Sequence, residues 1–127
     1  MANRNATPRQ RVAQNNINGN VVSNNIAARF PGSDREVRLV TPNGGVRFVD
    51  VLTPEGLAIE SKVGRTSLSN TVRIQASKDI ELFNDPFSLV NSLRFEFSRS
   101  PITGKVGPTP QLEIFLRENG FEIIIND

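Results

Sequence analysis

The sequence predicts an α/β domain with a mixed sheet, and three features of its pattern support this fold class. The length of 127 residues suits one domain with one hydrophobic core. Three segments of alternating apolar and polar residues follow one another and are separated by short turns containing Pro and Gly, which is typical of an antiparallel meander. Further along the chain, helical periodicity and strand-like alternation take turns, which favours helices packed on a partly parallel sheet.

The meander is predicted from strands over residues 36–41, 46–52 and 57–63. Two turn sequences, 42–45 and 53–56, lie between these strands, and both contain Pro and Gly. Consecutive strands joined by such short turns are expected to pair antiparallel with their neighbours.

The remaining elements follow from periodicity. An apolar residue recurs every four positions from Leu68 to Ile80, which indicates a helix from about Ser67 to Phe83 with Thr66 or Ser67 as its cap. The other expected elements are a helix over 19–28, a strand over 92–98, a short helix that begins at Pro110 and stops at Gly120, and a last strand over 121–125. Residues 1–18 are polar and are expected to form a flexible linker before a single domain over 19–127.

The absence of Cys and His excludes several kinds of site. Without Cys there are no disulfides, thiolate zinc sites or cysteine nucleophiles. Without His there are no Ser-His-Asp triads, His-ligated zinc sites or His general bases. Any catalysis must therefore use carboxylates, Lys, Arg, Ser, Thr or backbone groups. A metal ion ligated by oxygen atoms is the cofactor that suits such residues.

Charge and hydropathy set further limits. The formal net charge is only +2, so the chain is not a polybasic nucleic-acid binder. Lys62, Arg65, Arg73 and Lys78 form a basic group in the middle of the chain, and they are either phosphate contacts or ordinary solvated charges. No apolar run approaches the ~20 residues of a membrane span, and no signal peptide is visible.

Two acids and a lysine lie inside strands that are mostly apolar. Asp50 belongs to the strand 46–52, and Glu60 and Lys62 belong to the strand 57–63. Ionised groups in such strands are costly unless they are paired or bound to a metal. These three residues are therefore the candidates for a functional site.

The turn between these two strands determines how the charges meet. Pro54 occupies the position that a type I turn favours, and Gly56 can adopt the left-handed conformation that follows it. This pattern predicts a three-residue hairpin loop with a glycine bulge, in which Thr53 pairs with Leu57.

Counting back from that pair places Asp50 directly opposite Glu60, and strand alternation places Lys62 on the same face as Glu60. Two opposed carboxylates about 5 Å apart at Cβ repel each other and need a cation. Mg²⁺ or Mn²⁺ would neutralise the repulsion, and Lys62 could assist a water molecule activated by the metal. A two-residue loop would instead put Asp50 on the face opposite Glu60.

A different interpretation needs no catalysis. Glu60 and Lys62 would form a surface ion pair on a half-exposed strand, and Asp50 would be a charge at an edge. An Asp followed at this spacing by Glu-x-Lys is common by chance. The position of the residues on adjacent strands of a meander, with a helix after them, is what favours an active site.

The segments Val49-Asp50-Val51 and Ile59-Glu60-Ser61-Lys62 resemble the motif of the PD-(D/E)XK nuclease superfamily, whose fold is restriction-endonuclease-like. The expected order of helix, three strands, helix and strand over residues 19–98 is similar to the core of that fold. The run over 59–68, continued by 73–79, looks like the nuclease modules at the C-termini of bacterial polymorphic toxins.

The resemblance implies that Asp50 and Glu60 bind Mg²⁺ or Mn²⁺, that Lys62 assists the attacking water and that Gln75 on the following helix faces the site. Asp79 lies one turn after Gln75, and both are either site residues or part of a solvated helix face.

The function implied by the resemblance is that of a metal-dependent endonuclease that hydrolyses nucleic acid, with DNA favoured over RNA. As the toxic C-terminal module of a bacterial polymorphic or contact-dependent toxin, the domain would be delivered as part of a larger protein. It would act in the cytoplasm of the target cell and would be bound by a cognate immunity protein.

The sequence departs from the family pattern in the first helix, which usually carries a Glu as a further metal ligand. Residues 19–28 contain no acid. Asn24 or Asn25 could supply a neutral oxygen, Asp34 or Glu36 could replace the acid, or metal affinity and activity are reduced. The alternatives are a domain that binds nucleic acid or a partner without cutting, an RNase (in particular a tRNase) of the same fold, and a structural α/β module without an active site.

Overall fold

The computed structural model of the protein describes residues 19–127, and the predicted linker over 1–18 lies outside this range. A first helix is described over residues 19–28. The elements that follow it are β1 (Asp34–Val40), β2 (Val46–Leu52), β3 (Leu57–Val63), β4 (Arg65–Thr66), α2 (Asn70–Asn84), β5 (Ser92–Ser98), β6 (Gly107–Pro108), α3 (Pro110–Glu118) and β7 (Glu122–Asn126).

Five of these strands form one mixed sheet in the order β1-β2-β3-β5-β7. β1 pairs with β2 and β2 with β3 in antiparallel fashion, whereas β3 pairs with β5 and β5 with β7 in parallel. The short strands β4 and β6 form a separate parallel pair. The predicted α/β class with a mixed sheet is confirmed.

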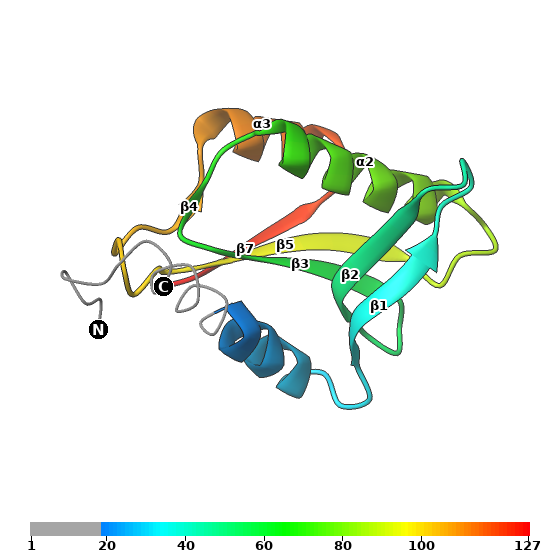
Figure 1. Ribbon diagram of the computed structural model, residues 1–127, viewed down its shortest axis with the longest axis horizontal. Coiled ribbons are helices and arrows are strands. Elements are labelled where there is room, and N and C mark those ends of the chain that lie inside the picture. Colours follow the sequence, from blue (N-terminus) through cyan, green and yellow to red (C-terminus); the bar gives the residue numbers. More distant parts are fainter. Residues whose placement is uncertain (1–18) are drawn as a thin grey trace.

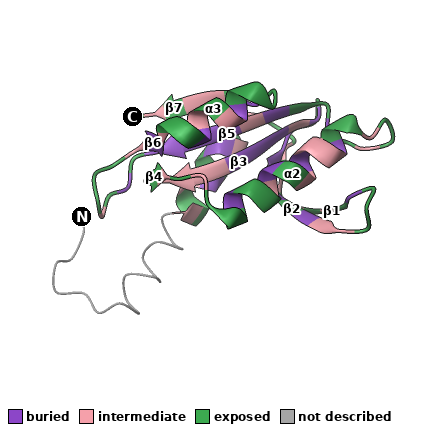
Figure 2. Cartoon of the chain, turned by 90° about the horizontal axis from the view of Figure 1, so that it is seen from above, coloured by how far each residue is buried: buried purple, intermediate pink, exposed green. Residues whose placement is uncertain are grey.

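Helices cover both faces of the sheet. Figure 1 shows α2 and α3 on one face and the first helix on the other. The larger hydrophobic core lies under α2 and α3 and includes Phe95, Phe97 and Leu112, and a smaller core joins Ile26 of the first helix to the sheet. Figure 2 shows that buried residues are concentrated along β3 and β5, which are central in the sheet.

A buried acid ties the first helix to the central strands. Glu96 of β5 is fully buried and forms an ion pair with Arg29, which follows the first helix. Arg94 lies 3.3 Å from the same carboxylate, and the side-chain amide of Asn126 donates to it at 2.8 Å. A charge removed from water needs such partners, so this network holds the first helix against the sheet.

The strands agree closely with the sequence prediction. The predicted ranges 46–52, 57–63 and 92–98 coincide with β2, β3 and β5, whereas β1 begins two residues before the predicted 36–41. The sequence does not predict β4 and β6, because two residues are too few to show an alternating pattern.

The helices differ from the prediction mainly at one end. α2 begins at Asn70, because the side chain of Ser69, rather than Thr66 or Ser67, caps it by accepting the N–H of Val72 at 3.2 Å. α3 begins at Pro110 as predicted. Across residues 19–127, none of the helices has both the length and the apolar character that crossing a membrane requires.

The two hairpins of the meander share one turn geometry. In each hairpin a threonine hydroxyl, of Thr41 or Thr53, accepts the N–H four residues further on at 3.0 Å. Each turn ends on a glycine with positive φ, +84° at Gly44 and +86° at Gly56. The second turn is therefore the predicted three-residue loop with a glycine bulge.

This loop sets the predicted register between β2 and β3. Val51 has Ile59 as its Cα partner, so the next residue along the register brings Asp50 opposite Glu60. The alternative with a two-residue loop is thereby excluded, because it would shift every pair by one residue.

Gly56 is also confined in space, which gives a matched pair of substitutions. A Cβ at Gly56 would lie 2.5 Å from the carbonyl oxygen of Leu89 and 2.6 Å from Nδ2 of Asn91, whereas a Cβ at Gly44 would meet nothing within 4 Å. We expect Gly44→Ala to lower the free energy of unfolding by about 1 kcal/mol, the cost of left-handed backbone. We expect Gly56→Ala to lower it by about 3 kcal/mol, because the clash adds to that cost. Urea denaturation measures both, and equal losses would contradict the confined turn.

Candidate active site

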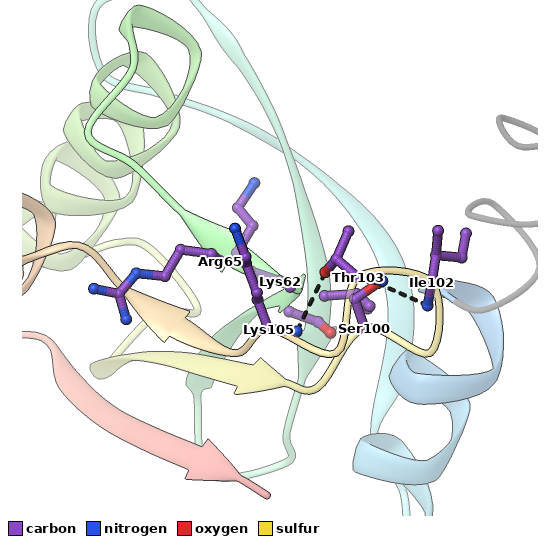
Figure 3. Close-up of a pocket in the computed structure, with 10 residues that line it drawn as sticks. Lys62, Arg65, Ser100, Ile102, Thr103 and Lys105 are labelled. Carbon is purple, nitrogen blue, oxygen red and sulfur yellow. Dashed lines mark hydrogen bonds between the residues drawn. The ribbon is translucent and has the colours of Figure 1, made fainter. Parts of the chain in front are cut away.

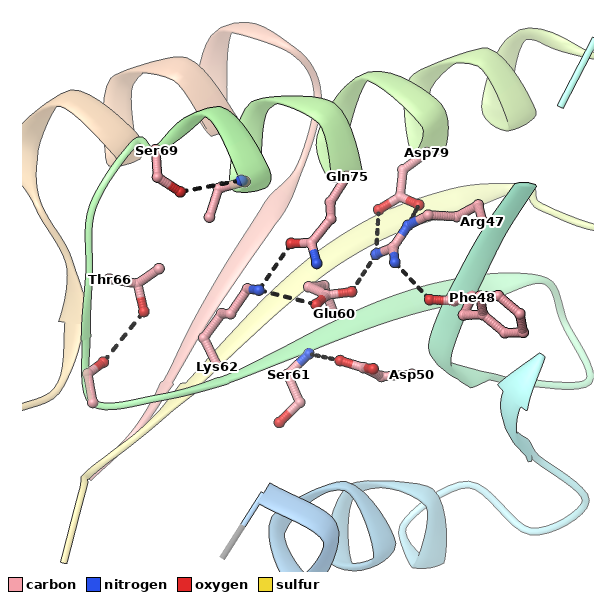
Figure 4. Close-up of polar contacts among 12 residues, drawn as sticks. Arg47, Phe48, Asp50, Glu60, Ser61, Lys62, Thr66, Ser69, Gln75 and Asp79 are labelled. Carbon is pink, nitrogen blue, oxygen red and sulfur yellow. Dashed lines mark hydrogen bonds and ion pairs between the residues drawn. The ribbon is translucent and has the colours of Figure 1, made fainter. Parts of the chain in front are cut away.

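β2 and β3 separate at Asp50. The strands pair at Val51, but at the following paired position the N–H of Ser61 donates to Oδ2 of Asp50 at 2.8 Å and not to the backbone of Val49. The carboxylate therefore takes the place of a backbone acceptor. This bond fixes Asp50 at the point where the two strands open (Figure 4).

The regular alternation of side chains between the two faces of β2 is interrupted at the same point. Val49 packs in the core under α2 and α3, whereas Val51 packs against the first helix. Figure 4 shows Asp50 on the side of β3 that faces the first helix, and Glu60 and Lys62 on the side that faces α2. Asp50 is thus opposite Glu60 in register, as predicted, but the two acids approach through the gap between the strands and do not project from one face.

Glu36 of β1 adjoins this irregular position. Its backbone φ is +52°, and among residues 19–127 no other residue except glycine has a positive φ. The Cα partners that flank it place it beside Asp50 of β2. Left-handed backbone costs a residue with a side chain about 1–2 kcal/mol, and such strain gathers at functional sites.

Asp50 faces a pocket of about 410 Å³ between the first helix and β1. Asn20 and Ser23 line this pocket from the first helix, Glu36 lines it from β1, and Ser61 lines it from β3. The hydroxyl oxygen of Ser61 is buried and has no hydrogen-bond partner among the described residues. A buried hydroxyl of this kind is suited to a polar ligand.

One of the predicted substitutes for the first-helix acid lies in this pocket. Glu36 lines it, whereas Asp34 is not among its lining residues. Asn24 instead accepts a hydrogen bond from Arg35 at 2.6 Å, and Asn25 lines a different pocket. Neither Asn lines the pocket that Asp50 faces.

Glu60, Lys62 and Gln75 meet on the other face of the sheet (Figure 4). Nζ of Lys62 lies 3.2 Å from Oε1 of Glu60 and donates to Oε1 of Gln75 at 2.9 Å. Strand alternation predicted the first contact, and the family resemblance implied that Gln75 faces the site. The structure brings all three side chains together.

Arg47 of β2 belongs to the same cluster, and sequence reasoning missed it. It is 6% exposed, forms an ion pair with Glu60 and donates from Nε to Oδ1 of Asp79 at 2.7 Å. A signal for it was present, because Arg47 alternates with the apolar Val49 and so belongs on a buried face. A guanidinium there requires carboxylate partners.

Two sequence interpretations are corrected by this burial. Asp79 is 4% exposed, so it is not part of a solvated helix face. Glu60 is also 4% exposed, and Asp50 lies in β2, which has a strand on each side. The interpretation of Glu60 and Lys62 as a surface ion pair, with Asp50 as an edge charge, is therefore wrong.

The electrostatics of the site raise the pKa of Asp50 to about 7. Burial is the largest cause, and the negative charge of Glu60 is the next, while the hydrogen bond from the N–H of Ser61 acts in the opposite direction. Near neutral pH a proton on Asp50 therefore relieves its repulsion with Glu60, and a bound cation could do the same.

Burial also raises the pKa of Asp79 to about 6, although the positive charge of Arg47 opposes the increase. For Arg47 itself burial alone would lower the pKa, but the charges of Glu60 and Asp79 outweigh it and raise the pKa above its usual value. Arg47 is therefore a permanent cation under the acids.

The other predicted phosphate contacts lie apart from this cluster. Arg65 lines a second pocket beside Lys62. Arg73 on α2 stacks over the ring of Phe115, with its guanidinium carbon 5.7 Å from the ring centroid. Lys78 donates to the carbonyl of Val46 at 3.0 Å. The structure thus brings Arg65, but neither Arg73 nor Lys78, to a pocket next to the site.

The carboxylate oxygens at this site have the chemistry that a hard divalent cation requires, but they are few. Asp50 and Glu60 offer carboxylate oxygens, which Mg²⁺ and Mn²⁺ prefer. Within residues 19–127 no group of three or more His, Cys, Asp or Glu side chains is arranged to hold a metal ion. The chain would therefore contribute two ligands and leave the rest to water and phosphate oxygens, as is usual for Mg²⁺.

Comparisons with protein-family models, curated proteins and solved structures return no match for the chain. The resemblance to the PD-(D/E)XK superfamily therefore rests on the motifs over 49–62 and on the order of the elements.

The raised pKa of Asp50 makes stability depend on pH. Because the pKa is raised above the unfolded value near 3.8, ionisation of Asp50 opposes folding, and the wild type loses stability as the pH rises from about 4 to 7. Asp50→Asn cannot ionise, so without divalent metal we expect it to be about 4 kcal/mol more stable than wild type at pH 8 and equally stable at pH 4. Chemical denaturation over this pH range measures the difference. Asp34→Asn, at an exposed position, is the control, and a difference for Asp50→Asn that does not change with pH would contradict the assignment.

Proposed function

We propose that this chain is a metal-dependent nuclease that hydrolyses phosphodiester bonds of nucleic acid, with DNA as the favoured substrate. One observation carries the proposal: Asp50 and Glu60 approach each other where β2 and β3 open, and Lys62 follows on the same strand, 3.2 Å from Glu60. A buried acid and a partly buried acid that repel each other would be stabilised by a divalent cation between them.

The residues divide the chemistry between them. Asp50 and Glu60 would hold Mg²⁺ or Mn²⁺, which when bound supplies positive charge for the phosphate and acidifies water. Lys62 is held by Glu60 and Gln75, so its ammonium group is placed to orient a water molecule and to balance charge that develops on the phosphate. Glu36 also lines the pocket of Asp50, but its carboxylate lies 3.9 Å from the guanidinium of Arg35 and is not counted among the metal ligands.

The biological setting is also a proposal. The likeness of residues 49–62 to the PD-(D/E)XK motif, together with the mixed sheet, supports a restriction-endonuclease-like core. The likeness of residues 59–79 to polymorphic-toxin modules supports delivery into a target bacterium as part of a larger protein. A cognate immunity protein would then cover the pocket that Asp50 faces, because blocking this pocket blocks access to Asp50.

A second candidate function is binding of nucleic acid without cleavage. It is favoured by the contacts of Glu60, whose carboxylate is already engaged by Arg47 and by Lys62. It is also favoured by the absence of an acid from residues 19–28. An RNase of the same fold, the third candidate, would cut tRNA in place of plasmid DNA.

Cleavage of supercoiled plasmid and of tRNA, in parallel, tests the proposal. We expect cutting with Mg²⁺ or Mn²⁺ and none with EDTA. Asp50→Asn, Glu60→Gln and Lys62→Met are each expected to lower the rate by roughly 100-fold or more, because each removes a charge that the reaction needs. Glu118→Gln, at an exposed position on α3, is the matched control and should cut like wild type.

The pH dependence adds a second readout to the same assay. Since the pKa of Asp50 is raised to about 7, a proton competes with the metal, and cleavage should fall about tenfold per pH unit below that value. Cutting that persists in EDTA would refute the mechanism. Metal-independent binding with no cutting under any divalent cation would select the second candidate.

A further inference from the structure

A second pocket, of about 580 Å³, adjoins the candidate site. Lys62, Arg65 and Lys105 line it together with the hydroxyl-bearing Ser100 and Thr103, and we call it the basic pocket (Figure 3). Ser61 lines both the basic pocket and the pocket of Asp50, and so does Gly19. The two pockets therefore meet at β3, between Asp50 on one side and the three cations on the other.

The charge of the basic pocket is of one sign. Its described lining includes three cations and no acid. Arg65 and Lys105 are exposed. Among the described residues, no carboxylate oxygen lies within 4 Å of the side-chain nitrogens of either residue. Two solvent-facing cations without acidic partners, beside a third cation in the site, form a surface suited to anions.

The loop that carries Lys105 is ordered by its own hydrogen bonds. Oγ of Ser100 accepts the N–H groups of Ile102 and Thr103, each at 3.1 Å, and the hydroxyl of Thr103 accepts the N–H of Lys105 at 3.2 Å (Figure 3). The N–H of Ser100 donates to the carbonyl of Lys105 at 2.9 Å, which closes the loop. Lys105 is therefore held near the pocket before any ligand arrives.

Arg65 is placed by a separate device. It lies in β4, whose parallel pairing with β6 sets Arg65 across from Gly107, two residues after Lys105. The two-stranded sheet and the closed loop together bring cations from two distant parts of the chain to one pocket.

We propose that the basic pocket binds the phosphodiester backbone of a nucleic acid on one side of the cleavage position, through Arg65 and Lys105. The inference rests on the proposed function for its substrate and adds where the strand lies and how it is held. Phosphate contacts made by cations fix the position of a strand without reading its sequence. The pocket has no aromatic residue among its described lining, so bases are not stacked there and binding should be indifferent to sequence.

Binding without metal tests the pocket separately from cleavage. A short fluorescein-labelled DNA duplex is titrated in EDTA at salt concentrations between about 50 and 200 mM. Arg65→Gln and Lys105→Gln are each expected to weaken binding by about tenfold and to lower the slope of log affinity against log salt by about 0.9. The matched control is Arg38→Gln, an exposed cation on β1 outside the pocket, which should leave both quantities unchanged. The same variants should raise KM for cleavage and leave kcat unaltered.

The outcomes separate this inference from the proposed function. If wild type cuts but the double variant Arg65→Gln, Lys105→Gln binds and cuts like wild type, the inference is overturned and the nuclease stands. If wild type never cuts but binding still depends on Arg65 and Lys105, the nuclease fails and the pocket stands as a nucleic-acid site. If polyglutamate of matched charge displaces the duplex as well as unlabelled DNA does, the pocket takes an acidic protein and the inference is overturned.

Discussion

The turn at Gly56 is the constraint on which the candidate site depends. Its left-handed glycine permits a three-residue loop, and the loop length fixes which residues of β2 and β3 face each other. In this register Asp50 lies opposite Glu60. The backbone pairing of β2 and β3 ends there, because the N–H of Ser61 donates to the carboxylate of Asp50. A loop longer or shorter by one residue would move every side chain of one strand to the other face of the sheet, and Asp50 would no longer lie opposite Glu60. A local backbone preference thus determines where charge is placed in the middle of a sheet.

The balance of charge at this point explains why the site suits a cation. Asp50, Glu60 and Asp79 are three acids with little exposure, and they are met by the cations Arg47 and Lys62. One negative charge is left over. A proton on Asp50 can remove it, because burial, and after it the charge of Glu60, raises the pKa of Asp50 to about 7, and a divalent cation can remove it more strongly. Arg47 has a permanent charge and holds Glu60 in place, so it keeps the acids together whether or not a metal is bound.

The parts of the fold that the sequence predicted are those specified by local rules. The bounds of β2, β3 and β5 followed from alternation, and the bulged loop followed from the positions of Pro54 and Gly56. The contact between Glu60 and Lys62 followed from the same alternation. What could not be predicted depends on packing between elements. Nothing local shows that Asp79 points inward, and the two-residue strands that place Arg65 have no pattern of their own. The slip of alternation at Asp50 likewise appears only when both neighbouring strands are present.

The most direct measurement is anomalous diffraction from crystals of the wild type and of Asp50→Asn soaked in Mn²⁺ at about pH 8, above the raised pKa of Asp50. In the wild type we expect one manganese peak between the carboxylates of Asp50 and Glu60. The peak should vanish in Asp50→Asn, while Arg47 keeps its contact with Asp79. A wild-type crystal with no manganese at this position, or one whose peak survives the substitution, would contradict the assignment of these two acids as the metal site.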